Sequence, residues 1–135
     1  MEKKLIDTNV LLRYLLKDND ALFKKAYEHL ERVKDGKELI IIPESVLAEC
    51  VYVLLRIYKV DRKVIAEKLR LLFVYKGVVN PDKEDLVDSI SLFGQTNLSI
   101  VDCIICAKSA NNKMPILTFD DELKNISRTK FHSYT

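Results

Sequence analysis

Apolar side chains recur at helical spacing along most of the chain. Between residues 19 and 34, for example, Leu22, Ala26, Leu30 and Val33 lie three or four positions apart among charged residues, which is typical of an amphipathic helix. The same reasoning predicts helices over residues 9–16, 19–34, 44–58, 62–73, 80–93 and 99–111, with a short helical turn at 119–123. We expect Asn80 to cap the fifth of these helices and Gly94 to end it.

Short apolar runs between these helices predict strands. The run that follows Glu38, residues 39–42, is wholly apolar and rich in isoleucine, as is typical of a parallel strand covered on both faces. Shorter candidates lie at residues 3–7, 77–79 and 114–118. Because strands and helices alternate without a linker or a repeat, the sequence predicts one α/β domain over residues 1–135 with a mainly parallel sheet.

Composition narrows the class of protein. The chain has 135 residues, of which 48% are hydrophobic and 31% charged, and its formal net charge is +2. These values exclude a disordered chain and a strongly basic nucleic-acid binder. With no apolar run of the ~20 residues needed to span a membrane and no signal peptide, we expect a cytoplasmic protein with no membrane partner.

The three cysteines, Cys50, Cys103 and Cys106, are an odd number in a chain without a secretory signal. We therefore expect free, buried thiols rather than a disulfide. A zinc site at the C-x-x-C of residues 103–106 would need two further ligands, and the only histidines, His29 and His132, are isolated in the sequence.

Acidic residues stand where predicted strands give way to helices. Asp7 follows the first apolar run and Asp120 follows the last, and the carboxyl ends of parallel strands are where sites form in open α/β sheets. Asp102 is the acidic member of a capping box that begins at Ser99. Taken singly, each of these three acids is also explained as a helix cap.

Glu49 lies at the apolar border of a narrow polar stripe on the predicted helix 44–58. A carboxylate on so apolar a helix is costly to bury unless it is paired or binds a metal. An ion pair with Arg56, two turns along the helix, is the alternative explanation.

Several of these acids precede or begin helices that leave one edge of the predicted sheet, so they should converge. Carboxylates a few ångströms apart repel each other unless a cation lies between them. Oxygen ligands without His or Cys favour Mg²⁺ or Mn²⁺, and such a centre is suited to phosphodiester hydrolysis. A phospho-signalling receiver is the competing α/β class, but only Asp7 stands at the first strand, where a receiver needs an acidic pair.

Four fragments, in order, resemble the PIN-domain ribonucleases, and among them the VapC-type toxins of prokaryotic toxin–antitoxin pairs. They begin with Leu5-Ile-Asp-Thr-Asn-Val-Leu-Leu-Arg and Ile42-Pro-Glu-Ser-Val-Leu-Ala-Glu-Cys, and continue with Leu98-Ser-Ile-Val-Asp-Cys and Ile116-Leu-Thr-Phe-Asp-Asp-Glu-Leu. The resemblance covers nearly the whole chain. It implies a single PIN domain, a three-layer α/β/α fold with a central, mainly parallel sheet of four to five strands.

The resemblance also implies roles for individual residues. Asp7 and Asp102 would be the chief metal ligands, with Glu49 and Asp120 completing the cluster. The expected supporting residues are Asn9, Ser99, Thr118 and Asp121, and Arg13 is the expected contact to RNA. Whether Asp120 or its neighbour Asp121 is the main fourth acid stays open at this point, as does the choice between one metal ion and two.

The activity implied is endoribonuclease cleavage of single-stranded RNA with Mg²⁺ or Mn²⁺ as cofactor. The implied partners are a cognate antitoxin and a second copy of the chain in a homodimer. Two alternatives stay open: an RNA-processing PIN nuclease outside toxin–antitoxin systems, and a non-catalytic PIN-like binding module in which the acids only cap helices.

Overall fold

The structure, a computed structural model, describes residues 1–17 and 20–126. Asn19, with which the second predicted helix begins, and His132 lie outside these ranges. The chain forms two compact units, which are described one at a time. Unit 1 comprises residues 1–60 and 71–81, and unit 2 comprises residues 61–70 and the chain from Asp82 onward.

The strands of unit 1 form a small parallel sheet. Strand β1 (Lys3–Leu5) pairs in parallel with β2 (Leu39–Ile41), with Lys4 opposite Ile40. On the other side of β2, the Ile40 N–H donates to the Gly77 carbonyl at 2.7 Å, and the Val79 N–H donates to the Ile40 carbonyl at 3.0 Å. The predicted strand at 77–79 is thus reduced to a single parallel bridge, between Ile40 and Val78.

Gly77 allows this third segment to approach β2. A Cβ atom at this position would lie 2.1 Å from the Glu38 carbonyl oxygen and 2.6 Å from the Val33 carbonyl oxygen. Both are backbone atoms that a rotamer change does not move. For this reason only glycine fits here. The Gly77 N–H also donates to the Val33 carbonyl at 2.7 Å.

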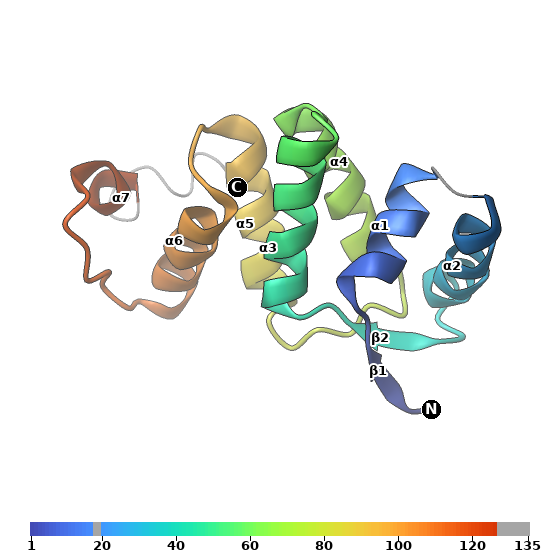
Figure 1. The fold of residues 1–135 in the computed structure, drawn as a ribbon. Helices are drawn as coiled ribbons and strands as arrows, with labels where there is room; N and C mark the ends of the chain where they lie inside the picture. Colours follow the sequence, from blue (N-terminus) through green and yellow to red (C-terminus); the bar gives the residue numbers. More distant parts are fainter. Residues whose placement is uncertain (18–19, 127–135) are drawn as a thin grey trace. The chain divides into compact units, whose positions relative to one another are not determined.

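Helix α1 (Thr8–Leu16) packs against α2 (Asp20–Lys34) and against α3 (Glu44–Tyr52), as Figure 1 shows. The core between them contains Leu11, Leu30 and Leu47, all fully buried. The next turn, η1 (Val53–Ile57), continues α3 with π-helical hydrogen bonding, in which the Tyr58 N–H donates to the Val53 carbonyl. The single helix predicted over residues 44–58 is therefore present, with a change of hydrogen-bond pattern in its last turn.

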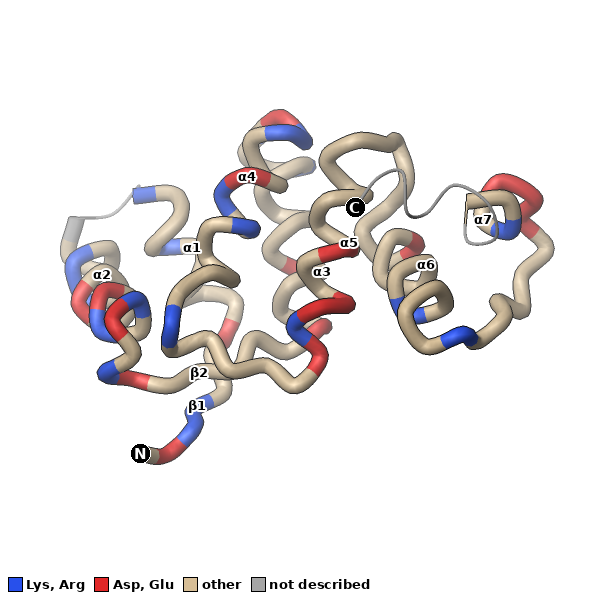
Figure 2. The backbone as a smooth tube through the Cα atoms, turned by 180° about the vertical axis from the view of Figure 1, so that it is seen from behind, with Lys and Arg blue, Asp and Glu red and all other residues tan. Residues whose placement is uncertain are grey.

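Helix α4 (Arg62–Phe73) has the predicted bounds, and its residues up to Arg70 belong to unit 2. That unit also contains α5 (Lys83–Gln95), α6 (Ile100–Asn112) and α7 (Asp121–Asn125). Helices α5 and α6 pack along each other. The acidic first turn of α7 is red in Figure 2, and acidic residues there favour the positive end of the helix dipole.

Arg62 holds the last turn of α5. Its guanidinium group stacks on the ring of Phe93 at 3.8 Å and donates to the Phe93 carbonyl at 3.1 and 3.2 Å. The prediction that Gly94 ends this helix is wrong, because α5 continues to Gln95. Gly94 instead allows close packing: a Cβ atom on it would lie 2.7 Å from the Cβ of Ala66.

The predicted sheet of four to five strands is the main error in the fold class. In the residues that the structure describes, the sheet has two strands and one bridged segment. Residues 114–118 form no strand, since no described segment makes a ladder of hydrogen bonds with them. The α/β class itself is confirmed, and within the described ranges no helix is long and apolar enough to cross a membrane.

Candidate functional site

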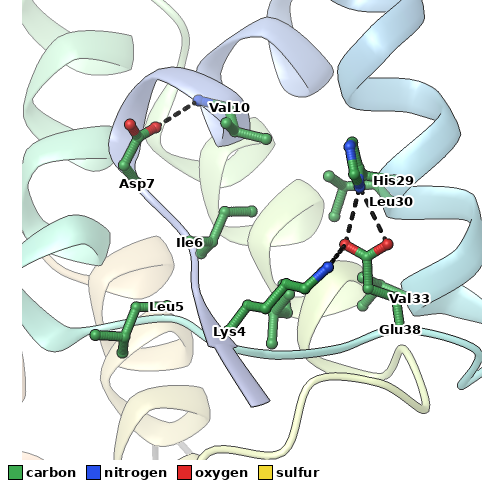
Figure 3. Close-up of a pocket in the computed structure, with 10 residues that line it drawn as sticks. Lys4, Leu5, Ile6, Asp7, Val10, His29, Leu30, Val33 and Glu38 are labelled. Atoms are coloured by element: carbon green, nitrogen blue, oxygen red, sulfur yellow. Dashed lines mark hydrogen bonds and ion pairs between the residues drawn. The ribbon is translucent and has the colours of Figure 1, made fainter. Parts of the chain in front are cut away.

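Asp7 connects β1 to α1 and caps that helix. Its backbone is extended (φ −95°, ψ 165°), and its Oδ1 accepts from the Val10 N–H at 3.0 Å (Figure 3). The side chain is exposed. In the described part of the chain the other oxygen, Oδ2, has no hydrogen-bond partner, so it is available to a ligand.

Glu49, on α3, lies near Asp7 of α1. Both carboxylates act on the buried thiol of Cys50: burial, and then the charges of Glu49 and Asp7, raise the pKa of this thiol to about 12. The Cys50 thiol also donates to the Thr8 carbonyl at 3.9 Å. The packing of α1 on α3 thus brings two of the four predicted acids close together.

Glu49 is exposed, as in the alternative explanation, but the ion pair with Arg56 that this explanation included is absent from the described residues. Since α3 packs with its Leu47 and Cys50 side inward, Glu49 lies outside the packed side of the helix.

In unit 2, Ser99 caps α6 as predicted, since its Oγ accepts from the Asp102 N–H at 3.1 Å. The reciprocal bond of a capping box, from the Ser99 N–H to the Asp102 carboxylate, is not formed. Asp102 is half-buried, and after the larger effect of burial its charge raises the pKa of the Cys106 thiol to about 11. The Asp102 carboxylate makes no hydrogen bond to a described residue.

Asp120 caps α7. Its Oδ1 accepts from the N–H groups of Glu122 at 2.9 Å and Leu123 at 3.4 Å, while the Thr118 hydroxyl accepts from the Asp120 N–H at 3.1 Å. Thr118 thus supports Asp120, although through the backbone rather than through the carboxylate. Asp121 is exposed in the first turn of α7 and makes no such cap, which favours Asp120 as the fixed acid of the two.

Two predicted residues lie beside Asp7. Asn9 and Arg13, both on α1, line a cavity of about 300 Å³ together with Asp7. Asn9 makes no hydrogen bond with Asp7, and no described residue bonds to its side chain. Arg13 is half-buried along the same cavity, a position from which its guanidinium group can contact an anion bound there.

Two of the four acids share one local arrangement. Asp7 and Asp120 each place Oδ1 on a helix N-terminus and leave Oδ2 free of described partners. The donor set is oxygen only, as Mg²⁺ and Mn²⁺ prefer. No group of three or more His, Cys, Asp or Glu side chains placed to hold a metal occurs within the described ranges. Asp7 and Glu49 belong to unit 1, and Asp102 and Asp120 to unit 2.

A buried ionic cluster around Glu38 was not predicted from the sequence. This carboxylate is only 8% exposed, and the His29 Nδ1 lies 2.9 and 3.0 Å from its two oxygens. Lys4 at 3.9 Å and Arg32 at 3.5 Å complete the cluster, part of which is drawn in Figure 3. His29 is therefore paired, not isolated. The signal in the sequence was the one acidic residue that directly precedes the most apolar strand.

The prediction that Asn80 caps α5 is also wrong. Asp82 occupies the N-cap position, and Asn80 is buried. Its Oδ1 accepts from the Ile42 N–H at 2.9 Å, and its Nδ2 donates to the Ile42 carbonyl at 2.7 Å. The side chain thus substitutes for a strand residue beside the end of β2 and fixes the point where α3 begins.

The fold and the acids define an α/β protein with carboxylates at the starts of its helices, a class to which several metal-dependent hydrolases belong. Comparison with protein families narrows the class: the PIN domain family matches residues 4–129, and the chain belongs to this family. No curated protein and no solved structure gave a significant match. PIN domains are generally metal-dependent nucleases, and membership supports a nuclease fold and a hydrolase.

Proposed function

We propose that the protein is a divalent-metal-dependent endoribonuclease that hydrolyses single-stranded RNA. The observation that carries the proposal is the PIN family match over residues 4–129, which includes all four acidic motifs in order. The geometry supports it, because two of these acids cap helices through one oxygen and keep the other free of described partners.

The proposed ligands of Mg²⁺ or Mn²⁺ are Asp7, Glu49, Asp102 and Asp120. A divalent ion held by them would lower the pKa of bound water and would neutralise charge on a phosphoryl oxygen. Asp7 and Glu49 would act from α1 and α3, which pack against each other. Thr118 and Ser99 fix the backbone of Asp120 and Asp102, and Arg13 would contact the RNA.

We further propose the role of a toxin in a toxin–antitoxin pair, with a cognate antitoxin and a second copy of this chain as partners. Support comes from the likeness of the four fragments to VapC-type toxins and from exposed apolar side chains at the end of α3 and in η1. Tyr52 is 61% and Ile57 64% exposed, and such a surface suits contact with another protein.

The test is cleavage of a labelled single-stranded RNA pool by the wild-type protein with Mn²⁺, with Mg²⁺ and with EDTA. We expect cleavage only with metal and a loss of at least about a hundredfold in Asp7→Asn. Asparagine is as good an N-cap as aspartate, so this variant should keep the Val10 bond and the fold.

The matched control is Asp35→Asn, which removes one exposed acid of unit 1 outside the four motifs. It should cleave at the wild-type rate. Cleavage in EDTA, or an Asp7→Asn variant as active as Asp35→Asn, would contradict the proposal. Absence of cleavage, together with unchanged thermal stability on addition of Mn²⁺, would favour the non-catalytic binding module.

A further inference from the structure

Two neighbouring cavities of unit 1 lie along α1 and α2. The first, of about 230 Å³, is lined by residues from Lys4 and Glu38 to Asp7, and the second, of about 300 Å³, by residues from Asp7 to Arg13 and Lys25. Both are lined by Asp7, Val10 and His29, and we call the two together the α1–α2 groove.

The rim of the α1–α2 groove is basic. Lys4 on β1, Arg13 on α1, and Lys25 and His29 on α2 line it. The Lys and Arg positions of these elements are blue in Figure 2, where α2 carries red acidic positions as well. Lys25 is exposed, and the side chains of Lys4 and His29 are 50% and 56% exposed. A row of basic side chains that are exposed to solvent attracts a polyanion.

Among the described residues two acids line the same groove. Glu38 offsets part of the charge of Lys4 and His29, whereas Lys25, in the second cavity, forms no ion pair with it. Glu38 is buried and is already surrounded by Lys4, His29 and Arg32. Asp7 is a proposed metal ligand. The other acids of α2 with described side chains, Glu28 and Glu31, line neither cavity.

The floor of the groove is apolar, with Val10, Leu22 and Ala26 between the cations of its second cavity. Cations beside an apolar floor match a single-stranded nucleic acid, whose phosphates need charge and whose unstacked bases need apolar surface. An acidic protein segment would use the cations but leaves its backbone amides against the apolar floor, where they cost free energy unless they are hydrogen-bonded.

Glu38 gives His29 a fixed orientation at the point where the two cavities meet. Because a carboxylate only accepts hydrogen bonds, the His29 Nδ1 donates to it. In the neutral ring the second nitrogen, Nε2, is then an acceptor, which is left for a hydroxyl or amino donor of a ligand in the groove. This is the arrangement of a buried carboxylate that orients a histidine for contact with a bound group.

We propose that the α1–α2 groove holds the single-stranded RNA substrate next to Asp7, with Lys25 contacting its phosphates and the Glu38-oriented His29 accepting a hydrogen bond from a ribose hydroxyl or a base. The proposal rests on the proposed ribonuclease function and adds the path of the strand. It predicts that RNA affinity depends on the cations of the groove and not on other lysines of α2.

The experiment measures binding of a fluorescent single-stranded RNA of mixed sequence to the full chain in EDTA, over a range of KCl concentrations. Lys25→Gln is compared with Lys24→Gln, its exposed neighbour on α2, which lines neither cavity. For single strands each phosphate contact contributes about 0.7 to the slope of log K against log salt concentration, so Lys25→Gln should lower the slope by about 0.7 and the affinity about fivefold at ~0.1 M salt. Lys24→Gln should change neither, and His29→Gln should weaken binding as well.

Equal effects of Lys24→Gln and Lys25→Gln, or no effect of either, would overturn the groove as the RNA path. Poly-glutamate serves as the competing ligand: if its binding alone depends on Lys25, the groove takes an acidic protein segment and the proposal is wrong. Cleavage with Mn²⁺ is scored separately. RNA binding that depends on Lys25 but is not followed by cleavage would refute the ribonuclease function and would leave the groove as an RNA-binding site. Cleavage that Lys25→Gln and Lys24→Gln affect equally would refute the groove as the path of the RNA and would leave the ribonuclease function.

Discussion

Replacing Asn80 with alanine removes two hydrogen bonds from the end of β2. The Ile42 N–H and carbonyl lose their partners at 2.9 and 2.7 Å, and Ile42 is fully buried, so water cannot replace them. Each buried polar group left unsatisfied costs roughly 1–3 kcal/mol. The expected loss is therefore about 2–6 kcal/mol, a large part of the ~5–15 kcal/mol that stabilises a typical domain.

Urea denaturation followed by circular dichroism measures this loss as a lower midpoint. Asn97→Ala is the matched control, since Asn97 is exposed and no described residue bonds to its side chain; its free energy of unfolding should stay within about 0.5 kcal/mol of wild type. Asn80→Asp keeps the acceptor for the Ile42 N–H but faces the Ile42 carbonyl with a second oxygen, so it should not restore stability. If Asn80→Ala unfolds within 0.5 kcal/mol of the control, the reasoning is refuted.

Three further predictions concern Gly77, Ser99 and the cysteines. Gly77→Ala should lower stability by ~3 kcal/mol or more in a thermal melt, because its Cβ would meet two backbone carbonyls; a melt unchanged from wild type would show that the approach is not tight. Ser99→Ala should cost about 1 kcal/mol in urea by removing the cap of α6, and an unchanged midpoint would contradict that. Cys50, Cys103 and Cys106 are free, with pKa values raised to about 12, 12 and 11, so a thiol reagent at pH 8 should label them only after denaturation. In the unfolded chain the thiols have a pKa near 8.5, so above that pH folding must reprotonate them. The free energy of unfolding should therefore fall from pH 9 toward 11 by up to about 1.4 kcal/mol per pH unit for each thiol. A free energy of unfolding that does not change with pH would contradict the burial of the thiols.

The helices were predictable from sequence because each carries its own periodic signal. The bounds of α4 match the prediction, and Ser99 was identified as a cap from the residues around it. Gly94 was misjudged for a local reason: a glycine near a helix end usually terminates it, but here Arg62 satisfies the Phe93 carbonyl and Ala66 needs the space.

The strands were less predictable because a strand requires a partner that the local sequence does not specify. Residues 114–118 alternate in burial as a strand would, with Ile116 and Thr118 half-buried and Leu117 exposed, yet no described segment pairs with them. The role of Asn80 was missed for the same reason, since its hydrogen-bond partner, Ile42, is 38 residues away in the sequence.

The acids of the candidate site were found because they follow apolar runs, and the capping interpretation and the metal interpretation are compatible. Asp7 and Asp120 cap helices with one oxygen and leave the other free of described partners. The cluster of Glu38 and His29 was not found, because an ionic contact between a helix and a strand leaves no periodic pattern in the sequence.

The most direct test of the central claim is calorimetric titration of Mn²⁺ into the wild-type protein and four variants, Asp7→Asn, Glu49→Gln, Asp102→Asn and Asp120→Asn. Loss of an exposed acid outside the four motifs, Asp35→Asn, is the control. We expect one saturable site for Mn²⁺ whose affinity falls about tenfold or more in each of the four variants and is unchanged in the control. Binding that persists in all four variants, or its absence from the wild-type protein, would contradict a metal centre built from these acids.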